Sequence, residues 1–314
     1  MKPAAPTLLA CLAVGLAASA ALLTHAAPAE SAAGAAPVAV SAPAATPSVA
    51  AARPGMILIP AGEYLPLLRG RDEPERVQVP GFWLDARPVT NAEFLAFVRA
   101  QPKWSRSRVS PLFADKGYLG DWAGDLELGA NVPAEAPVVR VSWFAARAYA
   151  AWAGKRLPKT AEWERAAAAG FEGENGMSEP AHRSAALGWF SKPSPARLPP
   201  AGSGRPNVHG VRDLLTLVWE WVDDFNTAMV TGESRADTGL ERTQFCGAGS
   251  VGARDLTNYP AFMRAGMRSS LRASYVVGNL GFRCVADATA AEKPPLAATG
   301  ETVAISATSS SISK

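Results

Sequence analysis

Residues 217–224, with the sequence LVWEWVDD, constrain the fold of this chain of 314 residues more than any other segment. In an extended segment, Trp219 and Trp221 point to one face of the strand and Glu220 points to the other. Burial of two indole rings removes a large apolar area from water, whereas a carboxylate beside them needs hydrogen bonds or a cation. The segment therefore predicts a core strand with an ion-paired glutamate.

The composition places the packed part of the chain in its middle. Residues 1–52 and 288–314 consist mostly of Ala, Pro, Ser and Thr, a composition that buries too little apolar surface to form a core. We expect one large domain at residues 53–287, preceded by an Ala/Pro-rich linker at 27–52 and followed by a disordered Ser/Thr/Ala tail. The net charge of +3 is small and comes with no basic run, so we expect neither a nucleic-acid partner nor binding to an anionic membrane surface.

The first residues have the pattern of a secretory signal peptide. Lys2 supplies the positive charge, residues 8–23 supply the apolar core, and residues 24–26 supply the cleavage region. We therefore expect residues 1–26 to be removed and the mature protein to be periplasmic or secreted, with no membrane contact beyond the signal segment. A retained anchor is the alternative, and the linker that follows would suit a tether.

Cysteine usage agrees with an exported protein. Removal of the signal removes Cys11 and leaves two cysteines, Cys246 and Cys284. In an oxidising compartment, an even number of cysteines favours a disulfide, here between Cys246 and Cys284. Two free thiols are the competing interpretation.

Local patterns predict two strands and a first helix in the first half of the domain. Short apolar runs at residues 56–62 and 77–84 predict the strands. Thr90 is the expected N-cap of the helix, and Glu93, three residues later, is its reciprocal capping partner. Residues 101–136 show no periodicity and are predicted to be loop.

Two further helices are expected in close succession. The second is predicted between Ser142, as its N-cap, and Gly154, which ends it. The third ends at Gly170 and carries Glu162 and Glu164 in its first turn, where the helix dipole favours carboxylates.

The second half of the domain is predicted to consist mainly of loops. Residues 171–206 are rich in Gly, Pro and Ser, and the arginines between Arg264 and Arg272 are predicted to form a solvated or ion-paired face rather than an anion site. Few helices, few long strands and tryptophan-rich segments together favour a mixed α+β domain.

Nine short segments occur in an order that resembles the formylglycine-generating enzyme family, also called the sulfatase-modifying factor family. The resemblance implies a single α+β domain that is a variant of the C-type lectin fold, with little regular secondary structure. The segments span nearly the whole predicted domain, and their order is more specific than any one of them. They are Gly62, 88–91 (PVTN), 141–143 (VSW), 156–158 (RLP), 161–164 (AEWE), Asn207 with Gly210, 218–221 (VWEW), 249–250 (GS) and 281–283 (GFR).

The resemblance implies less about the reaction, because the cysteines differ. Oxidising members of the family use two cysteines just after a Gly-Gly-Ser segment to bind copper and convert a substrate cysteine to formylglycine. Here Ser250 is followed by residues 251–258, which contain no cysteine. A pair of soft thiolates selects copper(I), so we expect neither a copper site of this kind nor formylglycine formation. Cys246 precedes the glycines and is the weak remaining candidate for a catalytic thiol, while Cys284 matches a structural cysteine of the family.

The resemblance also implies a calcium site and a substrate cleft. Glu220 is the candidate calcium ligand, although Leu217 stands where the family usually has an asparagine that takes part in metal binding, and a hard cation needs oxygen ligands. The side chains implied to line the cleft are Ser250, Trp221, Asn279 and Arg283.

The preferred functional hypothesis is an exported accessory protein that takes part in the maturation of an exported enzyme or cofactor. Its partner would be a polypeptide or small-molecule maturation substrate in the periplasm. The chain resembles exported relatives associated with copper nitrite reductase and with siderophore maturation, and the resemblance to the former rests on segments 219–226 and 245–249. Two alternatives stay open: an active oxidoreductase of the formylglycine-generating type that uses Cys246 or another metal, and a lectin-like binding protein.

Overall fold

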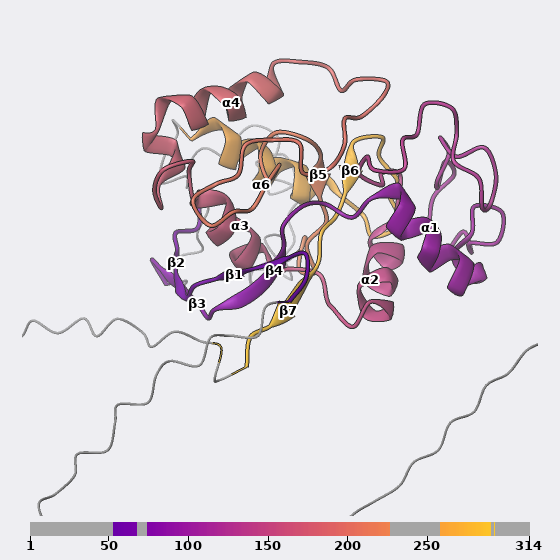
Figure 1. Ribbon diagram of the computed structural model, residues 1–314, viewed down its shortest axis with the longest axis horizontal. Helices are drawn as coiled ribbons and strands as arrows, with labels where there is room; N and C mark the ends of the chain where they lie inside the picture. Colours follow the sequence, from indigo (N-terminus) through magenta and orange to yellow (C-terminus); the bar gives the residue numbers. More distant parts are fainter. Residues whose placement is uncertain (1–52, 68–73, 227–257, 290–291, 293–314) are drawn as a thin grey trace, which may run out of the picture. The chain divides into compact units, whose positions relative to one another are not determined.

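A computed structural model describes residues 53–67, 74–226, 258–289 and 292 (Figure 1). All described residues lie within one compact unit, Pro47–Lys314. The predicted boundaries of the signal, linker and tail stay predictions. Among the helices that the structure describes, none is long and apolar enough to cross a membrane.

Short elements separated by loops make up the described part of the chain. Its helices are α1, α2, α3, α4 and α6, its two 3₁₀ turns are η1 and η2, and its strands are β1 to β7. In chain order they are β1 (Met56–Ile59), β2 (Gly62–Tyr64), β3 (Val77–Val79), β4 (Phe82–Asp85), α1 (Asn91–Ala100), η1 (Pro102–Trp104), α2 (Trp143–Trp152), α3 (Thr160–Ala168), η2 (Gly176–Ser178), α4 (Pro180–Phe190), β5 (Trp219–Glu220), α6 (Tyr259–Ser270), β6 (Leu280–Gly281) and β7 (Val285–Asp287). The α+β architecture with little regular secondary structure is confirmed.

Strands β1, β4 and β7 form an antiparallel sheet with the order β1-β4-β7, and β2 pairs with β3 in a separate antiparallel pair. Each of the two predicted strands is therefore interrupted. Pro60 ends β1 before β2 begins, and Pro80 with Gly81 separates β3 from β4. Proline lacks the N–H that a sheet interior requires, so the chain changes partners at both positions.

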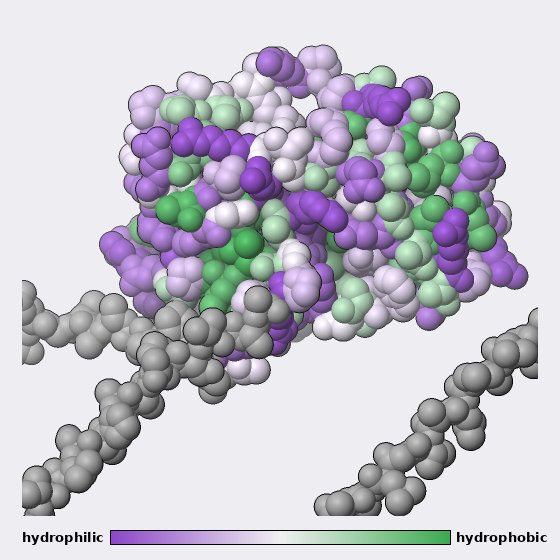
Figure 2. All heavy atoms as spheres, in the orientation of Figure 1, coloured by the Kyte–Doolittle hydropathy of each residue, from purple (hydrophilic) through white to green (hydrophobic). Residues whose placement is uncertain are grey.

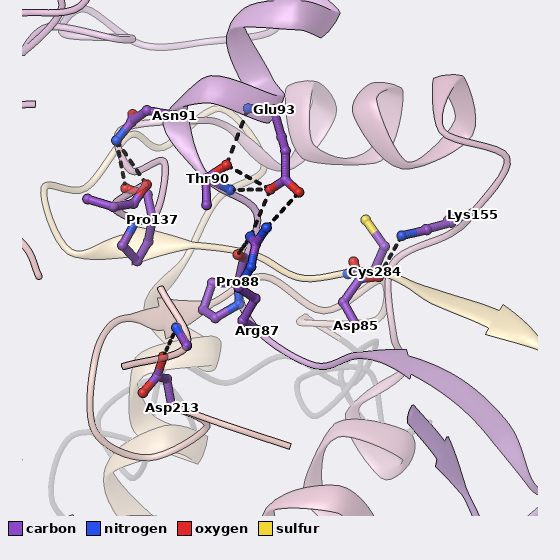
Figure 3. A network of polar contacts seen from close by, with 12 residues as sticks. Asp85, Arg87, Pro88, Thr90, Asn91, Glu93, Pro137, Lys155, Asp213 and Cys284 are labelled. Atoms are coloured by element: carbon purple, nitrogen blue, oxygen red, sulfur yellow. Dashed lines mark hydrogen bonds and ion pairs between the residues drawn. The ribbon is translucent and has the colours of Figure 1, made fainter. Parts of the chain in front are cut away.

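The N-terminus of α1 has the predicted capping box. The Glu93 N–H donates to Thr90 Oγ1, and the Thr90 N–H donates to Glu93 Oε2 at 2.8 Å (Figure 3). Arg87 extends the box, because its Nη1 and Nη2 each donate to the Glu93 carboxylate at 3.0 Å. The same spacing recurs before α3, where Arg156 donates two hydrogen bonds to Glu162. Both helices thus begin at a carboxylate held by an arginine six residues earlier.

The second helix begins and ends as predicted. The Ala145 N–H donates to Ser142 Oγ at 3.2 Å. The chain leaves α2 through Gly154, whose φ of +69° is in the left-handed region that glycine adopts without strain.

The prediction of loops over residues 171–206 is wrong for Pro180–Phe190, which forms α4. Proline at the first helical position is compatible with a helix start, since its missing N–H would have no intrahelical partner. His182 and Ala186 lie four residues apart and are buried on one side of α4. Most of the Gly, Pro and Ser residues that suggested loops lie before or after this helix. Helix α4 packs against α6, a helix that no pattern indicated (Figure 1).

An aromatic cluster joins α1, α2 and the segment between β6 and β7. Phe94 is fully buried and its ring contacts those of Phe97, Trp122, Tyr149 and Phe282 at centroid distances of 5.2–6.3 Å. The contact with Tyr149 is stacked and the other three are edge-to-face, and both kinds of pair stabilise the cluster beyond the apolar area that each ring buries. The cluster therefore fixes the loop that contains Trp122 against α1.

Candidate functional site

The Trp-Glu-Trp segment forms the short strand β5 and pairs in parallel with β6, so that Trp219 lies opposite Leu280 and Glu220 opposite Gly281. Trp221 follows directly, has no exposed surface, and donates from Nε1 to the Val141 carbonyl at 2.9 Å. The predicted core strand is confirmed, although only two residues have strand geometry.

Glu220 forms a fully buried ion pair with Arg283. Arg283 Nε donates to Glu220 Oε2 and Nη2 to Oε1, both at 2.8 Å, and neither side chain has any exposed surface. Trp163 Nε1 donates to Oε2 at 2.7 Å. Arg283 also donates to the carbonyls of Asp85 and Arg212. The predicted ion-paired glutamate is confirmed.

This ion pair determines what Glu220 and Arg283 can contribute to a site. Both oxygens of Glu220 accept hydrogen bonds from Arg283, which neutralises the carboxylate where a calcium ion would have to bind. Among the residues that the structure describes, no group of three or more His, Cys, Asp or Glu side chains could hold a metal ion. Calcium binding by the protein stays a prediction.

Cys284 lies beside the β4–β7 ladder and is fully buried (Figure 3). Burial and the neighbouring Asp85 carboxylate raise the pKa of its thiol well above the ordinary value. Asp85 accepts a hydrogen bond from the Cys284 N–H at 2.9 Å and forms an ion pair with Lys155 at 2.6 Å. The thiol is free in this structure. Since Cys246 and Ser250 lie outside the described residues, the disulfide between Cys246 and Cys284 stays a prediction.

A large cavity of about 600 Å³ lies between the loop after α1 and the segment that leads into β6. Asn279, one of the predicted cleft residues, lies in its wall, whereas Trp221 and Arg283 do not line it. Asn279 Nδ2 donates to Oγ of Ser194, another residue of the wall, at 3.2 Å. The described residues that line the cavity are Asn91, Leu119, Asp121, Trp122, Ala130, Asn131, Val132, Pro133, Ala136, Pro137, Val139, Arg140, Ser194, Pro195, Ala196, Leu198, Gly278 and Asn279.

The wall of the cavity near α1 is held by Asn91. Its Nδ2 donates to the carbonyls of Pro133 and Ala136 at 3.0 and 3.1 Å and to that of Pro137 at 3.3 Å, the last shown in Figure 3. Its Oδ1 accepts from Trp122 Nε1 at 3.2 Å. All polar atoms of this amide are thus used to fix the loop. Asn91 therefore supports the wall rather than offering a free group to a ligand.

Two residues of the wall have left-handed backbone conformations that sequence reasoning missed. Leu119 has a φ of +47° and Arg140 a φ of +56°, and the Leu119 N–H donates to the Arg140 carbonyl at 3.0 Å. Such conformations cost a non-glycine residue on the order of 1–3 kcal/mol and are concentrated at functional sites. No local pattern could have revealed them, because leucine and arginine seldom adopt this conformation.

On the face that Figure 2 shows, hydrophobic side chains lie in separate groups among hydrophilic ones rather than in one continuous patch. The large hydrophobic side chains that are exposed do not line the cavity. Within the described part of the chain they are Leu65, Leu112, Phe113, Leu126, Trp152, Leu187, Val208 and Tyr259. The cavity is therefore the strongest candidate for a binding site.

Comparisons with known proteins agree with this architecture. Residues 42–288 match the family model described as a sulfatase-modifying factor enzyme 1-like domain. The chain is 33% identical to the formylglycine-generating enzyme of Streptomyces coelicolor, with 76% of this chain and 92% of that protein covered. It is 30% identical to the inactive C-alpha-formylglycine-generating enzyme 2 of Mus musculus, with 76% and 87% covered.

Other similarities are partial or distant. Hercynine oxygenase of Mycolicibacterium smegmatis is 34% identical over 205 residues, which cover 54% of this chain but only 46% of that protein, so the chain spans less than half of its length. Among solved structures, PvdO from Pseudomonas aeruginosa is 21% identical with a TM-score of 0.42, and 74% of this chain and 94% of that chain are covered.

Proposed function

The chain belongs to the sulfatase-modifying factor family, and from this premise we propose that it is an exported accessory protein of the family. It binds a polypeptide or small-molecule substrate in the large cavity and acts in the maturation of an exported enzyme or cofactor. It does so without forming formylglycine.

The observation that carries the proposal is the distribution of the three cysteines in the sequence, Cys11, Cys246 and Cys284. The copper chemistry expected of oxidising members needs two neighbouring thiolates. Cys284 cannot supply one at the cavity, because it is fully buried beside Asp85 with a raised pKa and does not line the cavity. Cys11 lies in the predicted signal, so Cys246 is the one cysteine left that could supply a thiolate, and the copper site needs two. The residues present therefore do not fit the copper site.

The cavity supports a binding role. A volume of about 600 Å³ is within the range of 300–1,000 Å³ that is typical of ligand pockets. Its wall combines apolar residues such as Val132 and Pro133 with a few polar groups such as Asn279, as sites for small molecules and short peptide segments do. The strained Leu119 and Arg140 in the same wall favour function over accidental packing.

The proposal is tested by complementation of a strain that lacks the gene. The exported proteins and cofactors of the deletion strain are compared with those of the parent by mass spectrometry, which identifies the product whose maturation fails. Ala130→Trp, which places an indole in the exposed part of the cavity wall, is expected not to restore that product. Leu112→Trp, at a site that is 80% exposed and outside the cavity, is expected to restore it.

Two outcomes would overturn the proposal. Restoration by Ala130→Trp at the wild-type level would show that the cavity is not used. Failure of Cys246→Ser where Cys284→Ser, which would break the same predicted disulfide, restores the product would favour the oxidoreductase alternative, because the binding role requires no thiol.

A further inference from the structure

The cavity contains two charged side chains among the described residues that line it, Asp121 and Arg140. Their arrangement indicates which kind of ligand the cavity accepts. The geometry points to Arg140 as the residue that recognises a carboxylate on a ligand whose remaining body is apolar. This inference rests on the proposed function, since it assigns a ligand class to the same cavity.

The backbone of Arg140 is fixed from both sides. Its N–H donates to the Val277 carbonyl at 3.1 Å, and its carbonyl accepts from the Leu119 N–H at 3.0 Å. These two segments lie far apart in the sequence and hold Arg140 in the left-handed conformation, with a φ of +56°. A conformation that costs free energy persists only where surrounding contacts impose it. The direction in which the side chain leaves the backbone is therefore set by the fold.

The guanidinium group is also held in place. Arg140 Nε donates to Asp121 Oδ2 at 2.8 Å. On its other side the group lies against Gly278, where an added Cβ would come within 3.3 Å of Nη2 and 3.5 Å of Cζ. Any side chain at position 278 would crowd the guanidinium, so glycine leaves it room along the cavity wall.

This pairing leaves the end of the guanidinium free. An arginine side chain has five N–H donors, and Asp121 takes the one on Nε. No described residue accepts a hydrogen bond from Nη1 or Nη2, although 37% of the Arg140 side chain is exposed. Two parallel N–H groups on one planar fork match the two oxygens of a carboxylate.

Asp121 does not give the cavity the opposite preference. A cationic ligand would meet a carboxylate whose charge is already balanced by Arg140, whereas an anionic ligand can add to the Nη edge while the ion pair stays intact. The same wall also contains the apolar side chains of Val132, Pro133 and Leu198. The ligand that fits both features has an apolar body and one carboxylate.

The test uses two probes that differ only in charge, N-acetyl-prolyl-leucine and its carboxamide. Binding to the purified full-length protein is measured by ligand-observed NMR titration. We expect the wild type to bind the carboxylate probe about ten-fold more tightly than the carboxamide, as a charge-assisted hydrogen-bond pair at a half-exposed site allows. Arg140→Gln is expected to bind both probes equally. Arg140→Lys is expected to keep part of the preference, because the charge remains and the fork is lost.

Matched variants separate a local effect from a general one. Arg147→Gln removes an exposed arginine of α2 that does not line the cavity and should leave the ten-fold preference intact. Equal binding of both probes by the wild type, or no binding of either, would overturn the inference. If the preference is absent but Ala130→Trp still abolishes binding, only the charge assignment fails. If both probes bind Ala130→Trp as tightly as they bind the wild type, the cavity is not the binding site, and the proposed function is contradicted together with the charge assignment.

Discussion

Replacement of Arg283 by methionine is expected to lower the free energy of unfolding by about 3–5 kcal/mol. The substitution nearly preserves the volume of the side chain but leaves the Glu220 carboxylate buried without its cation, since both carboxylate oxygens face Arg283 and neither side chain reaches solvent. Trp163 can donate only one hydrogen bond to that carboxylate and cannot supply a charge. Urea unfolding followed by tryptophan fluorescence measures the loss.

A double variant separates the unpaired charge from the loss of packing. Glu220→Gln combined with Arg283→Met removes both charges and should recover at least half of the lost stability, because breaking a buried pair costs more than replacing it. Arg76→Met, which removes a surface ion pair with Glu63, should leave the urea midpoint unchanged. If Arg283→Met and Arg76→Met have the same free energy of unfolding, the buried pair of Glu220 and Arg283 does not stabilise the fold as predicted.

Replacement of Glu164 by glutamine is expected to cost roughly 3 kcal/mol at neutral pH. Glu164 is buried in α3 and accepts hydrogen bonds from Arg264 and Arg268 of α6 at 2.5–2.9 Å. Burial alone would raise its pKa, but the two guanidinium groups lower it from its ordinary value of 4.5 to about 2. Both arginines also lie over the Trp163 ring. The carboxylate therefore joins α3 to α6.

The pH dependence of this contribution has a definite sign. A carboxylate whose pKa is lower in the folded than in the unfolded chain stabilises the fold fully above its unfolded pKa, near 4.5. The stabilisation is lost as the pH falls from there towards 2. The free energy of unfolding of the wild type, measured with urea, should therefore fall steeply over this interval. That of Glu164→Gln should fall less. Parallel curves for the two proteins would contradict the ion pair between α3 and α6.

The parts of the fold that the sequence predicts well are those whose stabilising contacts are local. The start of α1 depends on Thr90 and Glu93, three residues apart, and the start of α2 depends on Ser142 and the helical turn after it. Glu164 shows the opposite case. Its predicted place in the first turn of α3 suggested a dipole contact, whereas its partners come from α6, about 100 residues later in the chain.

The same distinction applies to the candidate site. Glu220 was expected to need a cation, but the sequence could not show that the partner would be Arg283, which lies 63 residues away and was expected in the cleft. Asn279 was expected there from the family resemblance and does line the cavity. Arg140 was missed because its left-handed backbone depends on hydrogen bonds to Leu119 and Val277, which only the folded chain brings together.

The central claim is that this family member binds its substrate without a thiolate pair, and copper(I) tests it most directly. The purified protein is titrated anaerobically with copper(I), and X-ray absorption at the copper edge reports the number of sulfur ligands. Because Cys284 is buried with a raised pKa, we predict no copper(I) site with two protein thiolates and the same spectrum for Cys246→Ser. A stoichiometric two-sulfur copper site that disappears in Cys246→Ser would contradict the claim.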